Sequence, residues 1–576
     1  MGVAFGKSFI LDRSKVCVIK SELEPPQIED EIQRFRDAIH KSKQQIQETK
    51  ERAGKGADKF GVMLDTYVLL LEDEVLVKDT IDNIRSEFVN AEYAINMTLE
   101  KYVKLFDNIN DEYLKGKKDD LELVVQRIIR NLLGHEQETL DKIDQPVILI
   151  AHQLSPSDML MIDKNHIHGL VTEAGGKTSH LGIIASAMGI PAVVGAKDVT
   201  QKINSGDLII VDGIDGQVVP TPSNEDNRKY RKKCDNYKTF EDKLLEDIKL
   251  PAKTLDGCHV KLLANIESAH EIKTITHFGA EGIGLYRTEF LYLGRQKLPD
   301  ENELYEDFKK VVQGMDQNPV TIRTLDIGGD KMPHAIELEE EDNPTLGLRG
   351  IRMSLTFPDL LTCQMRALLR ASLYGKIKIL YPMVSFPDEI IEANRILEKV
   401  KSELRQNQIP FDESIQVGAM IETPASAISI DHILDQVDFI SIGTNDLIQY
   451  ILAVDRINEN VAHLYQPFHP SIIKILGDIF LAASIKNKEV SICGQLGGDP
   501  LATELLLGLG KINQLSMDPH SIPRVKKIIR GIKMDRAKKL ADHVRTLSST
   551  EEINSYLLRQ MKQILPFDFN RDTQQN

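Results

Sequence analysis

Residues 416–446 read QVGAMIETPASAISIDHILDQVDFISIGTND, and this stretch decides the fold. Its apolar runs Gln416–Glu422 and Phe439–Thr444 have the length and composition of buried strands. The segment between them is rich in helix-compatible apolar residues, so the stretch is predicted to be one strand–helix–strand unit. Parallel strands need such a crossover, and its repetition predicts a parallel sheet covered by helices.

The same rhythm occurs eight times from residue 260 onward. Six further strands are expected at Val260–Asn265, Gly282–Arg287, Val320–Leu325, Ile377–Met383, Val490–Cys493 and Ile512–Met517. Eight strand–helix units over about 300 residues predict a (β/α)8 barrel of the TIM type. We assign this domain to residues 251–570 and residues 571–576 to a flexible tail. Neither a Walker loop nor a GxGxxG motif follows any strand, so a nucleotide-binding fold finds no support.

The first part of the chain has a different pattern. Residues 1–21 and 141–222 contain short apolar runs separated by turn residues and predict one compact α/β domain. Residues 22–140 interrupt it, and their helical spacing predicts an inserted all-helical domain. Residues 223–250 are rich in charge and predict an exposed linker helix, which permits one domain to swing relative to the next. The fold class expected is therefore α/β multidomain.

The composition of the chain argues against several classes of protein. A net charge of −16 argues against a nucleic-acid binder. The five cysteines form no CxxC pair and are odd in number, which indicates a reducing cytoplasm. No apolar run approaches the ~20 residues of a membrane span, and residues 1–6 do not resemble a signal peptide. We therefore expect a cytoplasmic protein with no membrane insertion.

Polar side chains stand at the carboxyl ends of the predicted strands, on the barrel face that holds active sites. They are Asn265, Arg287, Arg323, Glu422, Asn445, Asp446 and Cys493, with Arg349 and Arg456 in loops that can fold over the same mouth. Any one arginine is as well explained by a salt bridge at the rim, but a structural barrel does not need the whole set. Convergent guanidinium groups bind phosphate and carboxylate oxygens bidentately. The set therefore predicts a small phosphorylated carboxylic acid as substrate.

Glu422 and Asp446 supply hard oxygen ligands on neighbouring strands. Mg²⁺ typically takes one or two carboxylates together with substrate oxygens and water, so these residues predict a magnesium site. Cys493 alone would usually be a small buried apolar residue. Because it ends a strand beside a glycine, it is instead expected to exchange a proton with the substrate, its pKa depressed by the metal and the arginines.

The stretch Gly175–His180, GGKTSH, precedes a helix-compatible apolar run. Thr178 or Ser179 can cap that helix, which puts His180 near the first turn, where free N–H groups favour a phosphate. Neutral imidazole is also a good nucleophile. An isolated histidine beside a glycine turn is usually structural, but beside a site for a phosphorylated acid His180 is predicted to carry a phosphoryl group.

The sequence resembles enzyme I of the phosphoenolpyruvate (PEP)-dependent phosphotransferase system across almost its whole length. The matching stretches are Gly175–His180, Gly284–Phe290, Arg323–Lys331, Glu422–Pro424, Ser441–Leu447, Ala453–Arg456, Leu464–Pro467, Cys493–Gly494 and Ser521–Arg530. The resemblance implies autophosphorylation of His180 from PEP with Mg²⁺ and release of pyruvate. It also implies transfer to a histidine of the phosphocarrier protein HPr, which docks on the helical domain, and a homodimer through the barrel domain.

The resemblance also assigns roles to the residues of the site. The substrate is held by Arg287, Arg323, Lys331, Arg349, Asn445, Asp446 and Arg456. Glu422 and Asp446 bind Mg²⁺, and Cys493 protonates the enolate. Sugar uptake is the expected end of the relay, and a regulatory nitrogen-branch enzyme is the alternative; the absence of a sensory domain before residue 1 argues weakly against it.

The helical domain departs most from the family pattern. Tyr67 replaces a usual histidine, Lys117 and Lys118 lie in a segment usually patterned with arginine and aspartate, and in the barrel Gln495 replaces a usual glutamate. Residues 60–114 hold 12 acidic against 4 basic residues, which indicates either a solvated helical surface or a docking face for a basic partner.

Two rival functions remain open at this point. An ATP-dependent dikinase or synthase shares the histidine domain and barrel, but residues 22–134 are too short and too helical for its ATP-binding domain. A non-catalytic relay protein that senses PEP is the other, and the intact His180 and Cys493 argue against it.

Overall fold

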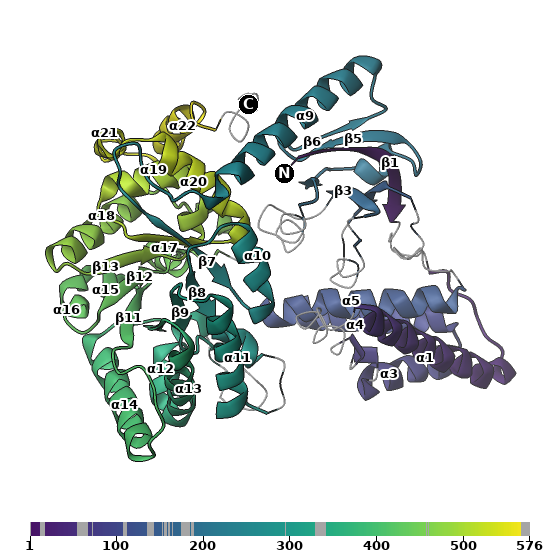
Figure 1. Cartoon of the computed structure of the whole chain (residues 1–576). Coiled ribbons are helices and arrows are strands. Elements are labelled where there is room, and N and C mark those ends of the chain that lie inside the picture. The colour runs from purple at the N-terminus through teal and green to yellow at the C-terminus, as the bar shows by residue number, and fades with distance from the viewer. Residues whose placement is uncertain are drawn as a thin grey trace. The chain divides into compact units, whose positions relative to one another are not determined.

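The computed structural model contains two compact units, residues 1–238 and 239–576, and each is considered by itself (Figure 1). The structure describes the chain except for residues 1, 12–17, 54–66, 69, 72, 108–111, 135–142, 144, 153, 155–157, 159–161, 164, 174–184, 186–188, 294, 296, 329–340, 342, 457, 459 and 566–576. In the part that it describes, no helix has both the length and the apolar content needed to cross a membrane.

The first unit contains a six-stranded mixed sheet in the order β4-β3-β2-β1-β5-β6. Its strands are β1 (Val3–Leu11), β2 (Val147–Ala151), β3 (Ile167–Thr172), β4 (Ala192–Val194), β5 (Leu208–Asp212) and β6 (Gln217–Pro220). Strands β1 to β4 run parallel, whereas β5 is antiparallel to both β1 and β6. Along β2, Leu149 packs in one apolar cluster and Ile148 and Ile150 in another, so both faces of the sheet are buried.

Two strand-forming residues before the helical domain are not part of the sheet. β1 is described as far as Leu11, and residues 18–20 are not in a strand although Val18 and Ile19 are good strand formers. Ile19 is 77% exposed, so strand propensity without a buried face is not enough to extend the sheet here. The short helix α8 (Val199–Lys202) follows β4.

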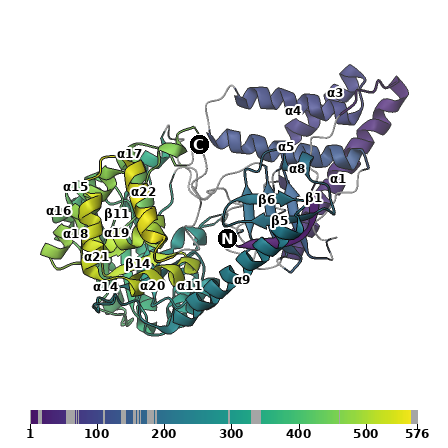
Figure 2. The ribbon, with the colours of Figure 1, turned by 90° about the horizontal axis from the view of Figure 1, so that it is seen from above.

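Four longer helices lie between β1 and β2 in the sequence: α1 (Ile28–Ala53), α3 (Glu74–Glu87), α4 (Ala91–Asp107) and α5 (Glu112–Leu132). They pack side by side around one apolar core that includes Phe35, Ile95 and Val125 (Figure 2). Tyr67 is buried in that core. Asp73 caps α3 by accepting hydrogen bonds from two backbone N–H groups of its first turn.

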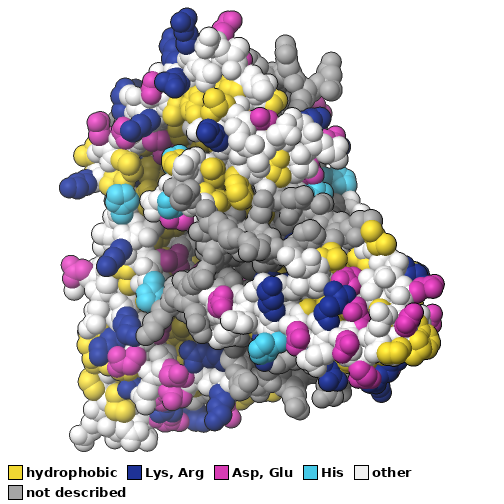
Figure 3. Space-filling view, turned by 90° about the vertical axis from the view of Figure 1, so that its right-hand side faces the viewer, with side chains coloured by type: hydrophobic (Ala, Val, Ile, Leu, Met, Phe, Trp, Pro, Cys, Tyr) yellow, Lys and Arg dark blue, Asp and Glu magenta, His cyan; other side chains and the backbone are white. Residues whose placement is uncertain are grey.

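Acidic and basic side chains are interspersed on the face of the molecule shown in Figure 3. In the helical domain, Arg34 Nη2 forms an ion pair with Glu92 Oε2 at 2.7 Å, and Lys101 Nζ forms one with Asp79 Oδ2 at 2.6 Å. Arg34 lies outside residues 60–114, so its pair with Glu92 offsets part of their acidic excess, whereas Lys101 is already one of the four basic residues counted there.

Helix α9 (Asn224–Glu246) begins in the first unit and ends in the second. Tyr230 and Tyr237 are buried in a cluster with Ile210 of β5, and α9 lies along β5 and β6 in both ribbon views (Figures 1 and 2). Beyond residue 240 its partners belong to the barrel unit, where Arg524 pairs with Glu241. The helical turn at residues 238–240 therefore lies between the part of α9 that packs on the sheet and the part that packs on the barrel unit.

The second unit contains a closed barrel of eight parallel strands in the order β10-β11-β12-β13-β14-β7-β8-β9. The strands are β7 (Lys261–Ile266), β8 (Ile283–Arg287), β9 (Val320–Arg323), β10 (Ile377–Tyr381), β11 (Gln416–Ile421), β12 (Phe439–Ile442), β13 (Glu489–Ile492) and β14 (Gln514–Met517). The predicted barrel is therefore confirmed, and each predicted strand end lies within two residues of the observed one.

Helices surround the barrel: α10 (Ile272–His277), α11 (Glu301–Gly314), α12 (Ile351–Thr356), α13 (Pro358–Ala371), α14 (Pro387–Gln406), α15 (Pro424–Ile428), α16 (Ile430–Leu434), α17 (Thr444–Leu452), α18 (Pro470–Ile485), α19 (Pro500–Leu509), α20 (Ile522–Gly531), α21 (Met534–Val544) and α22 (Thr550–Met561). Several begin with proline, whose missing N–H costs nothing in the first turn. Inside, Leu285, Leu380, Met420, Phe439 and Cys493 form one buried cluster. The interior is thus a packed core, which leaves the carboxyl ends of the strands for chemistry.

Candidate active site

Arg323, the last residue of β9, is the buried centre of the site. Its Nη2 donates to Glu289 Oε1 at 2.7 Å, and its Nη1 lies 2.7 Å from Asp326 Oδ2. Only 7% of Arg323 is exposed, and a guanidinium can be buried in this way because carboxylates on two sides offset the loss of hydration. Arg323 is therefore held in one orientation before any substrate arrives.

Asp326 extends this contact to a second arginine. Both of its carboxylate oxygens accept from Arg349 Nη2 at 3.3 Å, and the same nitrogen lies 3.2 Å from Asp446 Oδ2. Arg349 Nη1 also donates to the Tyr450 hydroxyl at 3.2 Å. A continuous chain of charge-assisted contacts thus runs from the end of β9 to the first turn of α17.

Glu422 follows β11 directly and is 2% exposed. Its Oε1 accepts the backbone N–H of Met383 at 2.6 Å. Met383 has a φ of +55°, a left-handed conformation that is uncommon for a residue with a long side chain. A Cβ at Gly443 would lie 2.5 Å from Glu422 Oε2, so the glycine leaves the space that the carboxylate occupies. Backbone strain and a missing side chain both serve to position Glu422.

Burial, then the negative charges of Asp446 and Asp326, raise the pKa of Glu422 above its ordinary value. The charges of Glu422 and Asp446 therefore repel each other, and a divalent cation bound near both would stabilise them as carboxylates. Among the described residues, no group of three or more His, Cys, Asp and Glu side chains is arranged to hold a metal ion. Two carboxylates are a donor set that Mg²⁺ accepts when substrate and water supply its remaining ligands.

Asn445 and Asp446 begin α17. Asn445 Oδ1 accepts the backbone N–H of Gln495 at 2.9 Å, which fixes the amide and leaves its NH₂ group as a donor. The contact uses the backbone of Gln495, whose side chain is exposed, so the replacement of the family's usual glutamate does not disturb it. Arg456 is partly exposed, and its Nη2 lies 3.8 Å from Asp446 Oδ1.

Cys493 is buried directly after β13, and its Sγ donates to the carbonyl of Ile442 at 3.5 Å. The backbone carbonyl of Cys493 accepts a hydrogen bond from Asn265 Nδ2 at 2.9 Å. Asn265 Oδ1 in turn accepts a hydrogen bond from the Ser516 hydroxyl at 2.6 Å. Burial raises the pKa of Cys493 to about 11, which outweighs the lowering effect of Arg323 and Arg287. The expectation of a depressed pKa is wrong for this thiol in the protein alone, and the group keeps its proton at neutral pH.

The structure brings most of the predicted residues to one end of the barrel. Asp326 joins Arg323 to Arg349, Arg349 contacts Asp446, and Glu422 is close enough to feel the charges of all of them. Arg287 ends the neighbouring strand β8 and donates to Glu267 Oε1 at 3.0 Å. His180 and Lys331 lie outside the described residues.

The sequence did not predict the roles of four residues of the site: Glu289, Asp326, Met383 and Asn265. Glu289 and Asp326 each stand two or three residues after an arginine of the predicted site, and this spacing was the available signal. Nothing in the sequence marks the left-handed conformation of Met383. Asn265 was noted as a strand end, but its bond to the carbonyl of Cys493 requires the closed barrel.

Sequence comparison agrees with this geometry. The PEP-binding domain of PEP-utilising enzymes matches residues 242–534, their mobile domain residues 143–216 and their N-terminal domain residues 1–117. The phosphoenolpyruvate-protein phosphotransferase of Haemophilus influenzae is 40% identical over 559 residues, which cover 96% of this chain and 97% of that protein. This chain belongs to the phosphoenolpyruvate-protein phosphotransferase (enzyme I) family.

Other members of the family are similarly close. The phosphoenolpyruvate-protein phosphotransferases of Geobacillus stearothermophilus and Priestia megaterium are each 41% identical. The matches cover 83% and 84% of this chain and 82% and 84% of those proteins. The chain is therefore a transferase enzyme of the phosphotransferase system, and the resemblance inferred from its motifs is confirmed.

Proposed function

We propose that this enzyme phosphorylates its own His180 from PEP in the presence of Mg²⁺, releases pyruvate, and passes the phosphoryl group to a histidine of HPr as the first step of sugar uptake. The observation that carries the proposal is the contact chain from Arg323 through Asp326 and Arg349 to Asp446, with Glu422 beside it. Because Arg323 and Arg349 are already paired with carboxylates, we infer that Mg²⁺ held by Glu422 and Asp446 would supply part of the positive charge that neutralises a small anion bearing both phosphate and carboxylate.

In this proposal the arginines orient PEP so that an imidazole nitrogen of His180 meets phosphorus in line with the bond to the enol oxygen. Positioning and charge neutralisation supply most of the catalysis in phosphoryl transfer. Mg²⁺, when bound by Glu422 and Asp446, stabilises the charge on the transferring group and on the enolate oxygen. The phosphorus–oxygen bond breaks as the nitrogen–phosphorus bond forms, and enolpyruvate remains on the barrel.

Cys493 is the proposed proton donor to the methylene carbon of enolpyruvate. A thiol with a pKa of about 11 is protonated at neutral pH, so it holds the proton that the carbon needs. Transfer of this proton gives pyruvate and a thiolate, which regains a proton from water. The hydrogen bond from Asn265 to the Cys493 carbonyl supports this role because it fixes the backbone that carries the thiol.

The remaining parts of the proposal concern partners and movement. We propose that HPr docks on the helical domain, that the histidine domain swings on the linker α9, that the barrel domain forms a homodimer, and that the enzyme works in the cytoplasm. Contacts of α9 to the sheet unit at Tyr230 and Tyr237, and to the barrel unit from Glu241 onward, support a pivot between them.

The test is turnover with defined partners. Pyruvate release should require both PEP and Mg²⁺ and should become catalytic only when HPr is added. Transfer to a nitrogen-branch carrier in preference to HPr would move the enzyme to the regulatory branch. Formation of PEP from ATP and pyruvate would overturn the proposal in favour of a dikinase or synthase.

A further inference from the structure

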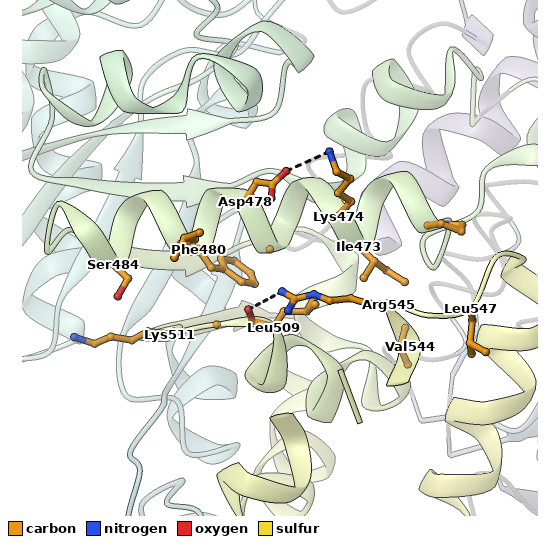
Figure 4. A pocket seen from close by; sticks show the side chains of 14 residues that line it. Ile473, Lys474, Asp478, Phe480, Ser484, Leu509, Lys511, Val544, Arg545 and Leu547 are labelled. Atoms are coloured by element: carbon orange, nitrogen blue, oxygen red, sulfur yellow. Dashed lines mark hydrogen bonds and ion pairs between the residues drawn. The ribbon is translucent and has the colours of Figure 1, made fainter. Parts of the chain in front are cut away.

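A cavity of about 680 Å³ lies on the outside of the barrel, between α18, the residues that follow α19 and the end of α21 (Figure 4). Phe480, Leu509 and Val544 line it but are almost fully buried, so the apolar surface that it offers comes from Leu481, which is 63% exposed, and from the half-buried Leu547. The volume is within the range that holds a small organic molecule. None of its lining residues belongs to the candidate active site.

Arg545, whose side chain is 45% exposed, places its guanidinium at the edge of this cavity. Figure 4 shows it beside Leu509, on the side of α18 that also carries Phe480. In the part of the chain that the structure describes, its partners are the Leu509 carbonyl at 3.3 Å and Asp542, 3.7 Å away and 74% exposed. A guanidinium has five N–H donors, so these contacts leave most of its hydrogen-bonding capacity for a ligand.

Gly477 allows the guanidinium to lie there. It lies in the middle of the continuous 16-residue helix α18, where glycine is unfavourable because of its backbone freedom. A Cβ at this position would be 2.8 Å from Arg545 Nη2. The glycine thus lets the charged group lie against the helix backbone.

The charge at the rim favours an anion. The lining contains the cations Lys474, Lys511 and Arg545 against one anion, Asp478, in a protein whose net charge is −16. Asp478 is paired with Lys474 at 3.8 Å. Lys511 has no ion-pair partner among the described residues, and it lies near Ser484 at one end of the cavity (Figure 4).

We propose that this cavity is a binding site for a small organic anion with an apolar body. Its carboxylate or phosphate group accepts from the Arg545 guanidinium, with Lys511 adding positive charge at the rim. Its apolar part lies against Leu481 and Leu547. The site is separate from the PEP site and independent of the function proposed above.

Octanoate and 1-octanol form a matched pair of probes, because they share an eight-carbon chain and differ in the anionic group. Titration calorimetry on the full-length enzyme should show saturable binding of octanoate that is at least tenfold tighter than that of octanol. Arg545→Gln should weaken octanoate at least tenfold and leave octanol unchanged. Gly477→Ala, which displaces the guanidinium, should weaken octanoate in the same direction.

The control is Arg395→Gln, which removes an arginine that is 72% exposed on α14 and should leave both affinities unchanged. Thermal unfolding and PEP-dependent pyruvate release report whether each variant is folded. Should Arg545→Gln fail to fold, Gly477→Ala decides the result. Equal affinity for the two probes, no saturable octanoate binding, or unchanged octanoate affinity in folded Arg545→Gln or Gly477→Ala would overturn the proposal.

Discussion

Replacing Asp326 by asparagine tests whether this carboxylate orients Arg323 and Arg349, because the substitution leaves both arginines and their charges in place. The carboxylate lies 2.7 Å from Arg323 and 3.3 Å from Arg349, and asparagine keeps its shape but turns an NH₂ group toward one guanidinium. Loss of one partner in a buried ion pair costs about 3–5 kcal/mol. We expect the lower end, about 3 kcal/mol, because Glu289 still holds Arg323.

The kinetic effect of Asp326→Asn should fall on kcat. A misplacement of about 1 Å costs on the order of 100-fold in rate, so we expect kcat to fall by about that factor. KM for PEP should stay level or fall, since removal of one negative charge strengthens the attraction for an anion. Pyruvate release in the presence of HPr, coupled to lactate dehydrogenase, measures both constants, and urea unfolding measures the stability. The control is Asp435→Asn, an exposed partner of Lys486. A raised KM with kcat within twofold of wild type would refute this reasoning.

Two further predictions concern the metal site and the thiol. Gly443→Ala places a Cβ 2.5 Å from Glu422 Oε2 and should raise the Mg²⁺ concentration for half-maximal activity about tenfold. Gly531→Ala, with its nearest neighbour at 3.6 Å, should not, and an equal effect in both would contradict the explanation. Because the pKa of Cys493 is raised to about 11, only about one thiol in a thousand is ionised at pH 8. Iodoacetamide should therefore label the exposed Cys258 first and Cys493 only as pH approaches 11; equal labelling at pH 8 would show the thiol to be accessible and ionised.

The barrel was predictable because its strands are buried on both faces. Such strands appear as continuous apolar runs, and runs such as Ile377–Met383 between helical segments leave few alternative topologies. The same logic located the site, since the last residue of a parallel barrel strand lies at the active face. The place of three residues at the end of an apolar run was enough to predict that they lie at this face of the barrel. They are Arg287, Arg323 and Cys493.

What the sequence did not reveal depends on contacts between distant segments. Asp326 can act only if the chain brings Arg349, more than twenty residues later, into contact with it. No local sequence pattern predicts that contact. The strained backbone of Met383 has no signal in the sequence because methionine rarely adopts this conformation. The raised pKa of Cys493 was missed for a related reason: the nearby arginines are visible in the sequence, whereas complete burial is a property of the closed barrel.

Direct observation of the phosphorylated residue tests the central proposal, that His180 takes its phosphoryl group from PEP. The wild-type enzyme and His180→Ala are incubated with ³²P-labelled PEP and Mg²⁺, denatured, and exposed to acid or base. We predict label on the wild type that is lost in acid and kept in base, and none on His180→Ala. Absence of label from the wild type, or equal label on the variant, would contradict the account.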